Sequence, residues 1–409
     1  MRIAFLAHLP PWPATSGGQQ KSIQTLEALC RCADVDIYTL ARSDADERDL
    51  RAPAPDWFKG TLRVFRIGRG PAQDIAAWLR SRYLLTPWFV ERDRIPALGM
   101  AVTSAHIQKP YDAIWVDHLQ MWGSAALEGV PAVLDTHNIE QDLLLQRSQA
   151  GDAFAVFART DIDRVRRFEN RVMSIADHVC VIGRGDAARV SELAPWTEKR
   201  VSILPPAVPV MRIPALLSVD AQPTLGFVGS MRWLANRDGM QDFLKVTWPQ
   251  VAAVFPNIRL LCAGRDTDVF CSDYIREHPE YVGRVIGLGT IPDLRVFWEQ
   301  IHVGIAPLRW GGGVKIKLIE SWGAGKPTLG TPVATVDIPQ DARFHTYVTS
   351  PDEWCAAIHQ LISSPETYVS AATQALAFAT DNHTVAVLQR EVATILRTVL
   401  KSQPTGVAL

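Results

Sequence analysis

Residues 303–331 constrain the fold more than any other stretch, because they combine an apolar run, a glycine loop and a helical pattern. The apolar run 303–308 leads into three consecutive glycines at 311–313, and the helical pattern begins at Val314. That helix breaks before Pro327, which opens a second apolar run. A strand, a helix and a strand in this order form the parallel crossover of α/β proteins. The sequence therefore predicts a parallel sheet covered by helices.

The glycine loop has the features of a phosphate site. Glycines let the backbone approach a ligand closely, and the free N–H groups of a first helical turn favour an anion. Lys317 lies in that turn and adds a positive charge. Glu320 follows three residues later on the same helical face, where its carboxylate can accept hydrogen bonds from vicinal sugar hydroxyls. The loop can thus hold a phosphorylated sugar or nucleoside; a flexible turn with solvated lysines is the alternative.

Apolar strands alternate with helices along the chain, and this pattern restarts once. The strands of the second half end at Gly229, Gly264 and Gly289, so the backbone there can line a ligand-binding crevice. A chain of 409 residues can form two domains with separate cores. Residues 201–210 contain three prolines, which cannot continue a sheet. We predict an N-terminal domain over 1–205, a C-terminal domain over 206–382, and a C-terminal helix and tail over 383–409 that can pack back on the first domain.

Three strand ends in the first half carry candidate ligand-binding groups. Gly17 and Gly18 lie in the loop after the first strand. His118 ends a later apolar strand, and His137 with Asn138 ends the next one. Ligands bind beyond the carboxyl ends of parallel strands, and these ends lie at one edge of the sheet. We therefore expect the two histidines to belong to a site, although a plain turn and structural histidines remain the alternatives.

The composition describes a globular protein whose net charge of -1 does not attract nucleic acid. Six scattered cysteines lack both CxxC spacing and the density of a disulfide scaffold, so we expect reduced thiols in a cytoplasmic protein. The sequence shows neither a signal peptide nor an apolar run long enough to span a membrane. Asp-x-Asp occurs four times, too often to indicate a metal site, and zinc-ligand spacing is absent. We expect no metal and no cofactor.

Residues 56–94 interleave arginines with large aromatic side chains. This mixture suits a membrane surface or a lipid-linked acceptor, because one end of each such side chain is apolar and the other is hydrated. An ordinary helical layer with aromatic residues facing the core is the alternative. The segment therefore predicts a peripheral contact with the inner face of a membrane.

Together these stretches resemble nucleotide-sugar-dependent glycosyltransferases of the GT-B fold, in the large retaining group called group 1 or family 4. The most specific motif is APLRWGGGVKIKLIESWGAGKPTLGT, which contains the glycine loop, the lysine and the glutamate. GFVGSMRWLANRDGM, LDTHNIE and RFENRVMSIADHVCVI are similar to further elements of the exopolysaccharide sugar transferases in this group. The resemblance implies two Rossmann-like domains facing each other across a central cleft, with the acceptor on the N-terminal domain and the nucleotide sugar on the C-terminal domain.

The resemblance also implies a role for each matching residue. Glu320 would bind the ribose hydroxyls, Lys317 the diphosphate and His118 the donor sugar, and these three are the expected catalytic residues. The expected donor-binding residues are Gly17, Gly18, Gly229, Ser230, Arg232, Arg237, Ile291, Gly311, Gly312, Gly313 and Val314. Backbone near Ile291 would read the base. His137 and Asn138 are expected to bind the acceptor.

Two positions depart from the pattern of the group. Gly312 occupies the place of a second glutamate that contacts the sugar hydroxyls, so sugar recognition there relies on backbone groups. Ser230 stands where a basic residue usually follows the first glycine, so neutralisation of the phosphates passes to Arg232 or Arg237. The group's retaining route uses no carboxylate nucleophile, and it needs no metal where lysine and arginine neutralise the leaving group.

The sequence thus predicts a retaining, metal-independent hexosyltransferase that builds a surface polysaccharide or another glycan. Its partners would be a UDP- or GDP-linked sugar and a saccharide or lipid-linked acceptor. Two alternatives stay open. A UDP-sugar 2-epimerase would share the two-domain plan and need no acceptor, although no paired carboxylates suit its proton chemistry. A non-catalytic nucleotide-sugar-binding partner is favoured by the missing glutamate at Gly312.

Overall fold

The computed structural model describes the chain except for residues 15, 52, 69, 125–126, 150–152, 196–199, 212, 214–222, 335–337, 340–341 and 402–409. The chain forms two units. The first unit contains Met1–Ala207 and Val385–Leu409, and the second contains Val208–Thr384. The division falls within the proline-containing segment 201–210, and the C-terminal helix belongs to the first unit. The predicted tail lies, from residue 402 onward, outside the described residues.

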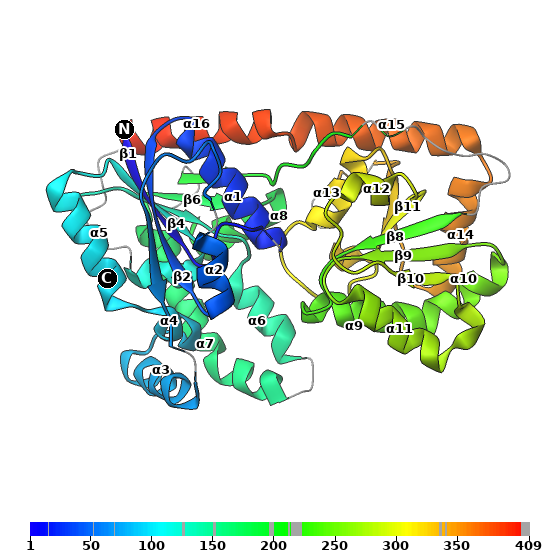
Figure 1. Cartoon of the computed structure of the whole chain (residues 1–409), viewed down its shortest axis with the longest axis horizontal. Coiled ribbons are helices and arrows are strands. Elements are labelled where there is room, and N and C mark those ends of the chain that lie inside the picture. The colour runs from blue at the N-terminus through cyan, green and yellow to red at the C-terminus, as the bar shows by residue number, and fades with distance from the viewer. Residues whose placement is uncertain are drawn as a thin grey trace. The chain divides into compact units, whose positions relative to one another are not determined.

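The first unit is a parallel sheet with helices on both faces (Figure 1). In its described residues, seven strands run in the order β3-β2-β1-β4-β5-β6-β7. The strands are β1 Arg2–Ala7, β2 Asp34–Ala41, β3 Leu62–Arg66, β4 Ala113–Asp117, β5 Ala132–Asp135, β6 His178–Val181 and β7 Val201–Ile203. The helices are α1 Gly17–Cys30, α2 Asp44–Arg51, α3 Pro71–Leu84, α4 Trp88–Asp93, α5 Pro96–Gln108, the 3₁₀ helix η1 Leu119–Ser124, α6 Glu140–Ser148, α7 Ala153–Ile175, α8 Arg184–Leu193 and α16 Val385–Lys401.

Strand β1 shows why this sheet is covered on both faces. Ile3, Phe5 and Ala7 pack in one core cluster with helices α1 and α16. Ala4 and Leu6 pack in the other cluster, which contains residues of α5 and α7. Successive side chains of a strand point to opposite faces, so a strand buried on both faces needs an uninterrupted apolar run. The sequence IAFLA meets this need.

The second unit is also a parallel sheet between helices. Its described residues form six strands in the order β10-β9-β8-β11-β12-β13. The strands are β8 Thr224–Val228, β9 Arg259–Ala263, β10 Val285–Gly287, β11 Val303–Ala306, β12 Thr328–Gly330 and β13 His345–Tyr347. The helices are α9 Leu234–Asp242, the π-helix η3 Phe243–Thr247, α10 Trp248–Val254, α11 Thr267–Glu277, η4 Pro279–Tyr281, α12 Leu294–Trp298, α13 Ile316–Gly323, η5 Pro332–Ala334, α14 Pro351–Ile362 and α15 Pro365–Asn382.

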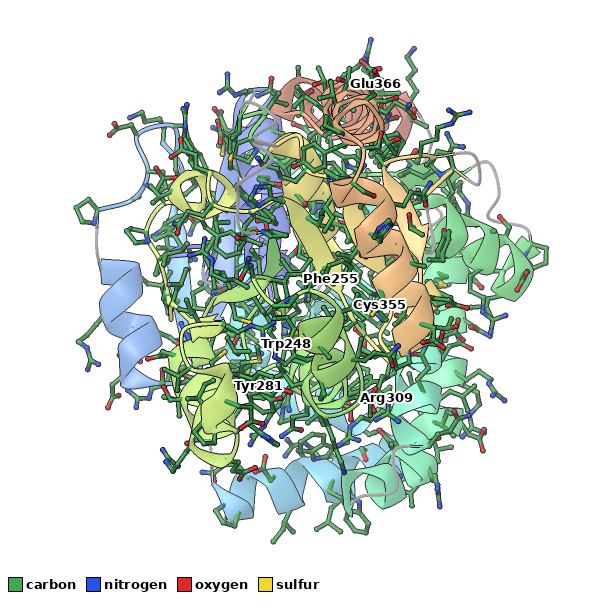
Figure 2. The ribbon with its side chains drawn as sticks, turned by 90° about the vertical axis from the view of Figure 1, so that its right-hand side faces the viewer. Trp248, Phe255, Tyr281, Arg309, Cys355 and Glu366 are labelled. Atoms are coloured by element: carbon green, nitrogen blue, oxygen red, sulfur yellow. The ribbon has the colours of Figure 1, made fainter. Side chains whose placement is uncertain are left out.

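The largest core of the second unit includes residues of α10 and α14, which lie beside the sheet. Trp248 is fully buried in it, and Phe255 and Cys355 pack against the same cluster (Figure 2). Tyr281 meets the ring of Trp248 edge to face, with the ring centres 6.1 Å apart. This core lies under helices and leaves the carboxyl ends of the strands free for a site.

Both sheets reverse their strand order at one point. The reversal lies between β1 and β4 in the first unit and between β8 and β11 in the second. In the first unit the register pairs Ala7 with Asp117 and Asp117 with Asp135, so three strands end side by side. A doubly wound sheet binds ligands beyond the carboxyl ends of its strands at such a point. The residues that follow these strands therefore define the candidate site.

Two elements of the second unit differ from the sequence prediction. Helix α13 begins at Ile316 and not at Val314, because the backbone of Lys315 is extended, with φ -88° and ψ 97°. Strand β13 was not predicted, since its sequence, HTY, is not an apolar run. None of the helices in the described residues combines the length and hydrophobicity needed to cross a membrane.

Candidate functional site

Helix α1 brings Gly17 and Gly18 to the carboxyl edge of the first sheet. The helix begins earlier than predicted, because the Ser16 hydroxyl caps it by accepting a hydrogen bond from the N–H of Gln19. The two glycines are therefore the first helical residues and not a loop. Among the described residues, no acceptor meets their backbone N–H groups, so this helix end can receive an anion.

Because Gly18 has no side chain, the space beside the imidazole rings of His118 and His137 stays open. A Cβ atom at this position would lie 3.7 Å from Nδ1 of His137 and 3.9 Å from Nε2 of His118. The ring centres of the two histidines are 3.8 Å apart. The structure thus brings together three residues that the sequence placed after three different strands.

Asp117 holds both histidines in place. Nδ1 of His118 and Nε2 of His137 each lie 3.0 Å from a different oxygen of its carboxylate. The Ser22 hydroxyl donates to the carboxylate at 2.8 Å. His118 has a φ of +76°, an uncommon conformation for a residue with a side chain, which indicates a local constraint at the strand end. Sequence reasoning missed Asp117, although an aspartate at the last position of a buried strand was a usable signal.

The pKa values of Asp117, His118 and His137 are shifted in different directions. Burial by itself would raise the pKa of Asp117, but the two histidines outweigh burial and hold this pKa well below its usual range. Burial opposes the charge of His118, whereas Asp117 favours it more strongly, and the pKa of His118 is raised. Burial and the charge of His118 lower the pKa of His137 well below its usual range. The two pKa shifts therefore favour the positive charge on His118 over His137.

His137 presents a hydrogen-bond acceptor to the open space. Its Nε2–H donates to the Asp117 carboxylate, so its Nδ1 carries a lone pair. Nδ1 is buried and has no hydrogen-bond partner among the residues that the structure describes. Such an atom can accept a hydrogen bond from a ligand hydroxyl, which compensates the cost of its burial.

A second carboxylate ties helix α1 to this edge. Lys21 and Asp135 form a fully buried ion pair, and the Trp115 indole donates to Asp135 at 3.2 Å. Asn138 is half-buried next to the cluster, and its carbonyl accepts from the Thr136 hydroxyl. The position of Asn138 is thus set by its backbone, which leaves its side chain available to a ligand.

Asp117, His118 and His137 also have the arrangement of a possible metal site. One ligand atom from each residue lies within 4.8 Å of the others. In the structure the carboxylate oxygens accept hydrogen bonds from both rings, which accounts for the arrangement by hydrogen bonding. Measuring the transfer rate after chelation of divalent ions separates a metal site from a hydrogen-bonded cluster.

The glycine loop of the second unit is held from within by a lysine. Gly311 and Gly313 have φ values of +133° and +67°, which favour glycine. The ammonium of Lys315 donates to the carbonyls of Gly311, Gly312 and Gly313 at 3.3, 2.6 and 2.7 Å. Lys315 therefore positions the loop, a role that the sequence prediction did not assign.

The loop and the first turn of α13 offer unpaired amides. In the described part of the chain, no acceptor meets the N–H groups of Gly312, Gly313, Val314, Ile316 and Lys317. Lys315, which precedes the helix, supplies no side-chain cap. Free amides at a helix N-terminus bind anions, because the helix dipole adds to their partial charges.

Three elements meet at the ammonium group of Lys317. Its Nζ donates to Oδ1 of Asn236 at 2.5 Å and lies 4.4 Å from the ring centre of Phe227. A Cβ atom at position 229 would lie 3.2 Å from this Nζ and 2.6 Å from Nδ2 of Asn236. Gly229 is thus required for the approach of the asparagine. Sequence reasoning did not assign Asn236, although the residue lies in the motif GFVGSMRWLANRDGM.

Burial shifts the pKa values of Lys317 and Glu320, both on α13, to about 7. It lowers the pKa of Lys317 to about 7, and the nearby charge of Lys315 adds to this effect. Burial raises the pKa of the Glu320 carboxyl to about 7, partly offset by Lys317. A half-buried lysine and a buried glutamate with such shifts, at the carboxyl edge of a doubly wound sheet, are typical of a functional site.

We expect Lys317 to make the binding of UDP weaken, relative to the Lys317→Arg variant, as the pH rises above about 7. A diphosphate stabilises the Lys317 ammonium, so the complex keeps a proton that the free protein loses above its pKa. The affinity should then fall by up to about tenfold per pH unit, which titration calorimetry would measure. Lys317→Arg is the control, because arginine keeps its charge and removes this part of the dependence. The same pH dependence in both proteins would contradict the assignment.

The remaining predicted donor residues are less central. Arg232 is exposed and pairs with Asp266 at 2.7 Å, and Arg237 is exposed on α9. The Ser230 carbonyl accepts from the Asn236 amide at 3.0 Å. Ile291 packs, partly buried, against an apolar cluster of the second unit. The structure therefore gathers Gly229, Asn236 and Lys317 at the glycine loop and leaves the two arginines at the surface.

Comparisons with known proteins agree with this architecture. Residues 222–364 match the family described as Glycosyl transferases group 1. Sucrose-phosphate synthase from Thermosynechococcus elongatus superposes with a TM-score of 0.71, at 16% identity over 98% of this chain and 99% of that chain. Anabaena Alr3699/HepE, solved in complex with UDP-glucose, superposes with a TM-score of 0.64, at 14% identity over 97% and 100%. No curated protein sequence matches the chain.

A third structure of the same fold is WaaG, a glycosyltransferase involved in lipopolysaccharide biosynthesis. It has a TM-score of 0.66, at 15% identity over 96% of this chain and 99% of that chain. The predicted fold class, two Rossmann-like domains of the GT-B architecture, is confirmed. The resemblance to the group 1 glycosyltransferases is confirmed as well, and the family match lies in the unit that carries Lys317 and Glu320.

Proposed function

We propose that the protein is a retaining glycosyltransferase that moves a sugar from a nucleoside diphosphate to a saccharide or lipid-linked acceptor. One observation supports this most directly. Lys317, with a pKa of about 7, lies beside unpaired amides at the start of α13, and Glu320 is buried one turn further along. The amides and the lysine suit a diphosphate, and the carboxylate suits the ribose hydroxyls.

The proposed reaction needs charge stabilisation and no protein nucleophile. The bond between the anomeric carbon and the phosphate oxygen breaks, and the acceptor oxygen bonds to the same face of the carbon. The acceptor proton passes to the departing phosphate oxygen, and the nucleoside diphosphate leaves. Lys317 and the loop amides stabilise the negative charge as it develops on that group. His118 would bind the sugar, and His137 with Asn138 would bind the acceptor.

The proposal is tested by supplying UDP- and GDP-linked sugars with a panel of saccharide acceptors. We expect release of nucleoside diphosphate only when an acceptor is present, and a product with the anomeric configuration of the donor by NMR. An isomerised sugar formed from the donor alone would select the epimerase instead. Tight donor binding without turnover on any acceptor would select a non-catalytic partner. The variant Glu320→Gln should weaken binding of UDP more than that of pyrophosphate, because pyrophosphate has no ribose.

Chelation of divalent ions is expected to leave the transfer rate unchanged. In the proposal the leaving group is neutralised by Lys317 and by amides, so no metal takes part. The measurement compares initial rates before and after dialysis against EDTA. A loss of activity that zinc or manganese restores would contradict the metal-independent route, and it would point to Asp117, His118 and His137 as the ligands.

A lipid-linked acceptor would bring the protein to a membrane. The expected peripheral contact of residues 56–94, at the cytoplasmic face of that membrane, therefore belongs to the proposal. It is also open to a test that does not depend on catalysis.

A further inference from the structure

Helix α3 presents an apolar surface to solvent. The helix buries only Ala77 and Ser81 of its fourteen residues. Its large apolar side chains, with the residue that follows the helix, are exposed: Ile75 59%, Trp78 41%, Leu79 56%, Tyr83 85%, Leu84 43% and Leu85 61%. We call these six residues the α3 surface. Single exposed apolar residues are ordinary, but a cluster of this kind marks an interaction site.

Arginines lie beside the α3 surface, and the two carboxylates of the neighbouring helix α4 are buried. The side chains of Arg80 and Arg94 are 51% and 45% exposed. The guanidinium of Arg82 lies 5.1 Å from the ring centre of Trp78. Glu91 and Asp93 are each 1% exposed, which leaves Asp74 as the exposed carboxylate on α3. Arg82 pairs with the buried Asp161 at 3.2 Å, whereas Arg80 and Arg94 share the single carboxylate of Glu91, so the excess positive charge lies at Arg80 and Arg94.

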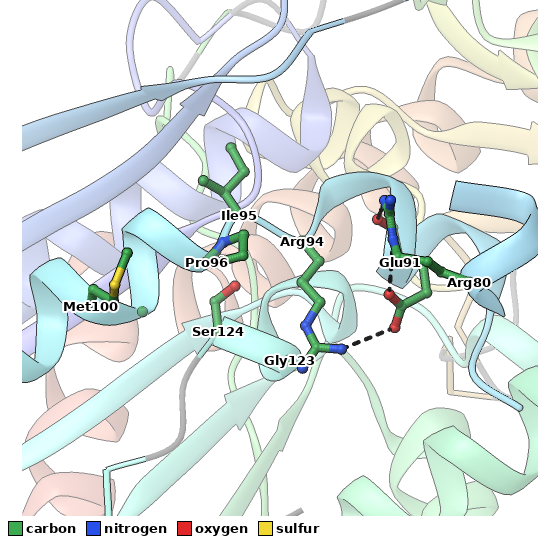
Figure 3. Close-up of a pocket in the computed structure, with 9 residues that line it drawn as sticks. Arg80, Glu91, Arg94, Ile95, Pro96, Met100, Gly123 and Ser124 are labelled. Carbon is green, nitrogen blue, oxygen red and sulfur yellow. Dashed lines mark hydrogen bonds and ion pairs between the residues drawn. The ribbon is translucent and has the colours of Figure 1, made fainter. Parts of the chain in front are cut away.

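A pocket of about 600 Å³ is lined in part by Arg80, which belongs to the same helix as the α3 surface (Figure 3). Glu91 is the buried carboxylate of the pocket, and its two oxygens lie 3.7 Å from Arg80 and 3.4 Å from Arg94. One carboxylate thus serves two guanidinium groups, which leaves an excess positive charge at the mouth. Met100, 66% exposed, and the Ser124 hydroxyl complete a lining of apolar and polar groups.

We propose that the α3 surface docks on a membrane that contains anionic lipids, with Arg80 and Arg94 binding a lipid phosphate at the mouth of the pocket. Apolar side chains flanked by arginine suit a bilayer interface, where apolar burial and attraction to anionic headgroups add together. A guanidinium group binds phosphate through paired hydrogen bonds. Trp78 and Tyr83 are side chain types that favour the boundary between apolar and hydrated layers.

The position of the pocket links this surface to the candidate site of the same unit. Ser124 ends η1, which begins immediately after His118. The pocket therefore lies near the carboxyl edge at which the first unit would bind its acceptor. This link to the acceptor rests on the proposed function, whereas docking on a membrane does not. Vesicle binding is measured without donor or acceptor, so a failure of one proposal is distinguishable from a failure of the other.

The test is co-sedimentation of the full chain with phosphatidylcholine vesicles, with and without phosphatidylglycerol. We expect binding to the vesicles with phosphatidylglycerol, weakened by added salt because salt screens the arginines. The double variant Ile75→Ser, Leu79→Ser should weaken binding by about tenfold or more, since two exposed apolar side chains no longer enter the interface. Arg94→Gln should weaken it about fivefold, and Glu91 keeps Arg80 as its partner in this variant.

Matched controls come from helix α11 of the second unit. Val269 is 58% exposed and Arg276 is 75% exposed, so Val269→Ser and Arg276→Gln remove the same kinds of group elsewhere. Both controls should bind vesicles as the unchanged protein does. Equal losses in the α3 and α11 variants would overturn the proposal, as would equal binding to both kinds of vesicle.

Trp78 supplies an independent measurement. Brominated lipids quench tryptophan fluorescence at short range, and the quenching lost in Trp78→Phe reports the depth of this side chain. We expect this difference only with anionic vesicles. If the protein sediments with the vesicles but Trp78 is not quenched, α3 is not the contact and the proposal is overturned. A concentration-dependent dimer that the Ile75→Ser, Leu79→Ser variant abolishes, without vesicle binding, would assign the surface to a second copy of the chain.

Discussion

Replacing Lys317 by methionine lowers kcat/KM for sugar transfer by about 100- to 1,000-fold, the range found when one preorganised donor to a developing anion is removed. Methionine retains the apolar stem of the side chain and its packing near Phe227 but carries no charge. Asn236 then loses the group that it holds, and the diphosphate meets the loop amides alone. Steady-state kinetics with saturating acceptor measure the effect.

Lys326→Met is the matched control for this variant. Lys326 is a fully buried lysine of the same unit, and it precedes β12 at the opposite end of the strand from the candidate site. Its replacement should leave kcat/KM near the original value. If both variants lost activity equally, a general effect of removing a buried lysine would explain the loss. If Lys317→Met remained fully active, the proposed leaving-group site would be wrong.

Replacing Asp117 by asparagine is expected to lower the transfer rate by about 100-fold, the lower end of the loss found when one preorganised electrostatic contact is removed. The carboxylate now accepts from two imidazole rings and one hydroxyl. An asparagine offers one acceptor oxygen and one donor group, so at least one ring loses its orientation. The carboxylate also raises the pKa of His118.

The pH profile of the Asp117→Asn variant separates charge from packing. The charge of His118 is present below its folded-state pKa and is lost as the pH rises through it. Without Asp117 this pKa falls, so the activity of the variant should decline at a lower pH than that of the unchanged protein. Asp161→Asn, another buried carboxylate of the first unit, is the control and should keep the original profile. A lower rate with an unshifted profile would mean that Asp117 acts only through packing.

Much of the fold follows from local patterns. Uninterrupted apolar runs such as residues 3–7 and 113–116 form the central strands, and the motif around Lys317 and Glu320 predicts the loop and helix that carry them. These features depend on neighbours in sequence, so they can be recognised without coordinates. Strand β13 escaped prediction because its sequence, HTY, is not an apolar run.

The residues that position the candidate site were harder to find. Asp117 matters because of His118 beside it and His137, twenty positions away in the chain, and its role depends on the register of two strands. Asn236 reaches Lys317 across eighty-one positions. Arg232 satisfied the sequence criteria for a phosphate ligand, yet it pairs with Asp266 at the surface.

The sequence by itself determined the two-unit α/β architecture, the glycine loop with its lysine and glutamate, and the two histidines at successive strand ends. Only the tertiary structure decided which charges those groups carry and which neighbours hold them. The reason is physical: apolar periodicity and loop chemistry are local properties of the chain, whereas a pKa is set by burial and by charges that distant segments bring within a few ångströms. Lys317 and His118 show this in opposite directions, because burial lowers the pKa of the lysine, while a buried aspartate raises that of the histidine.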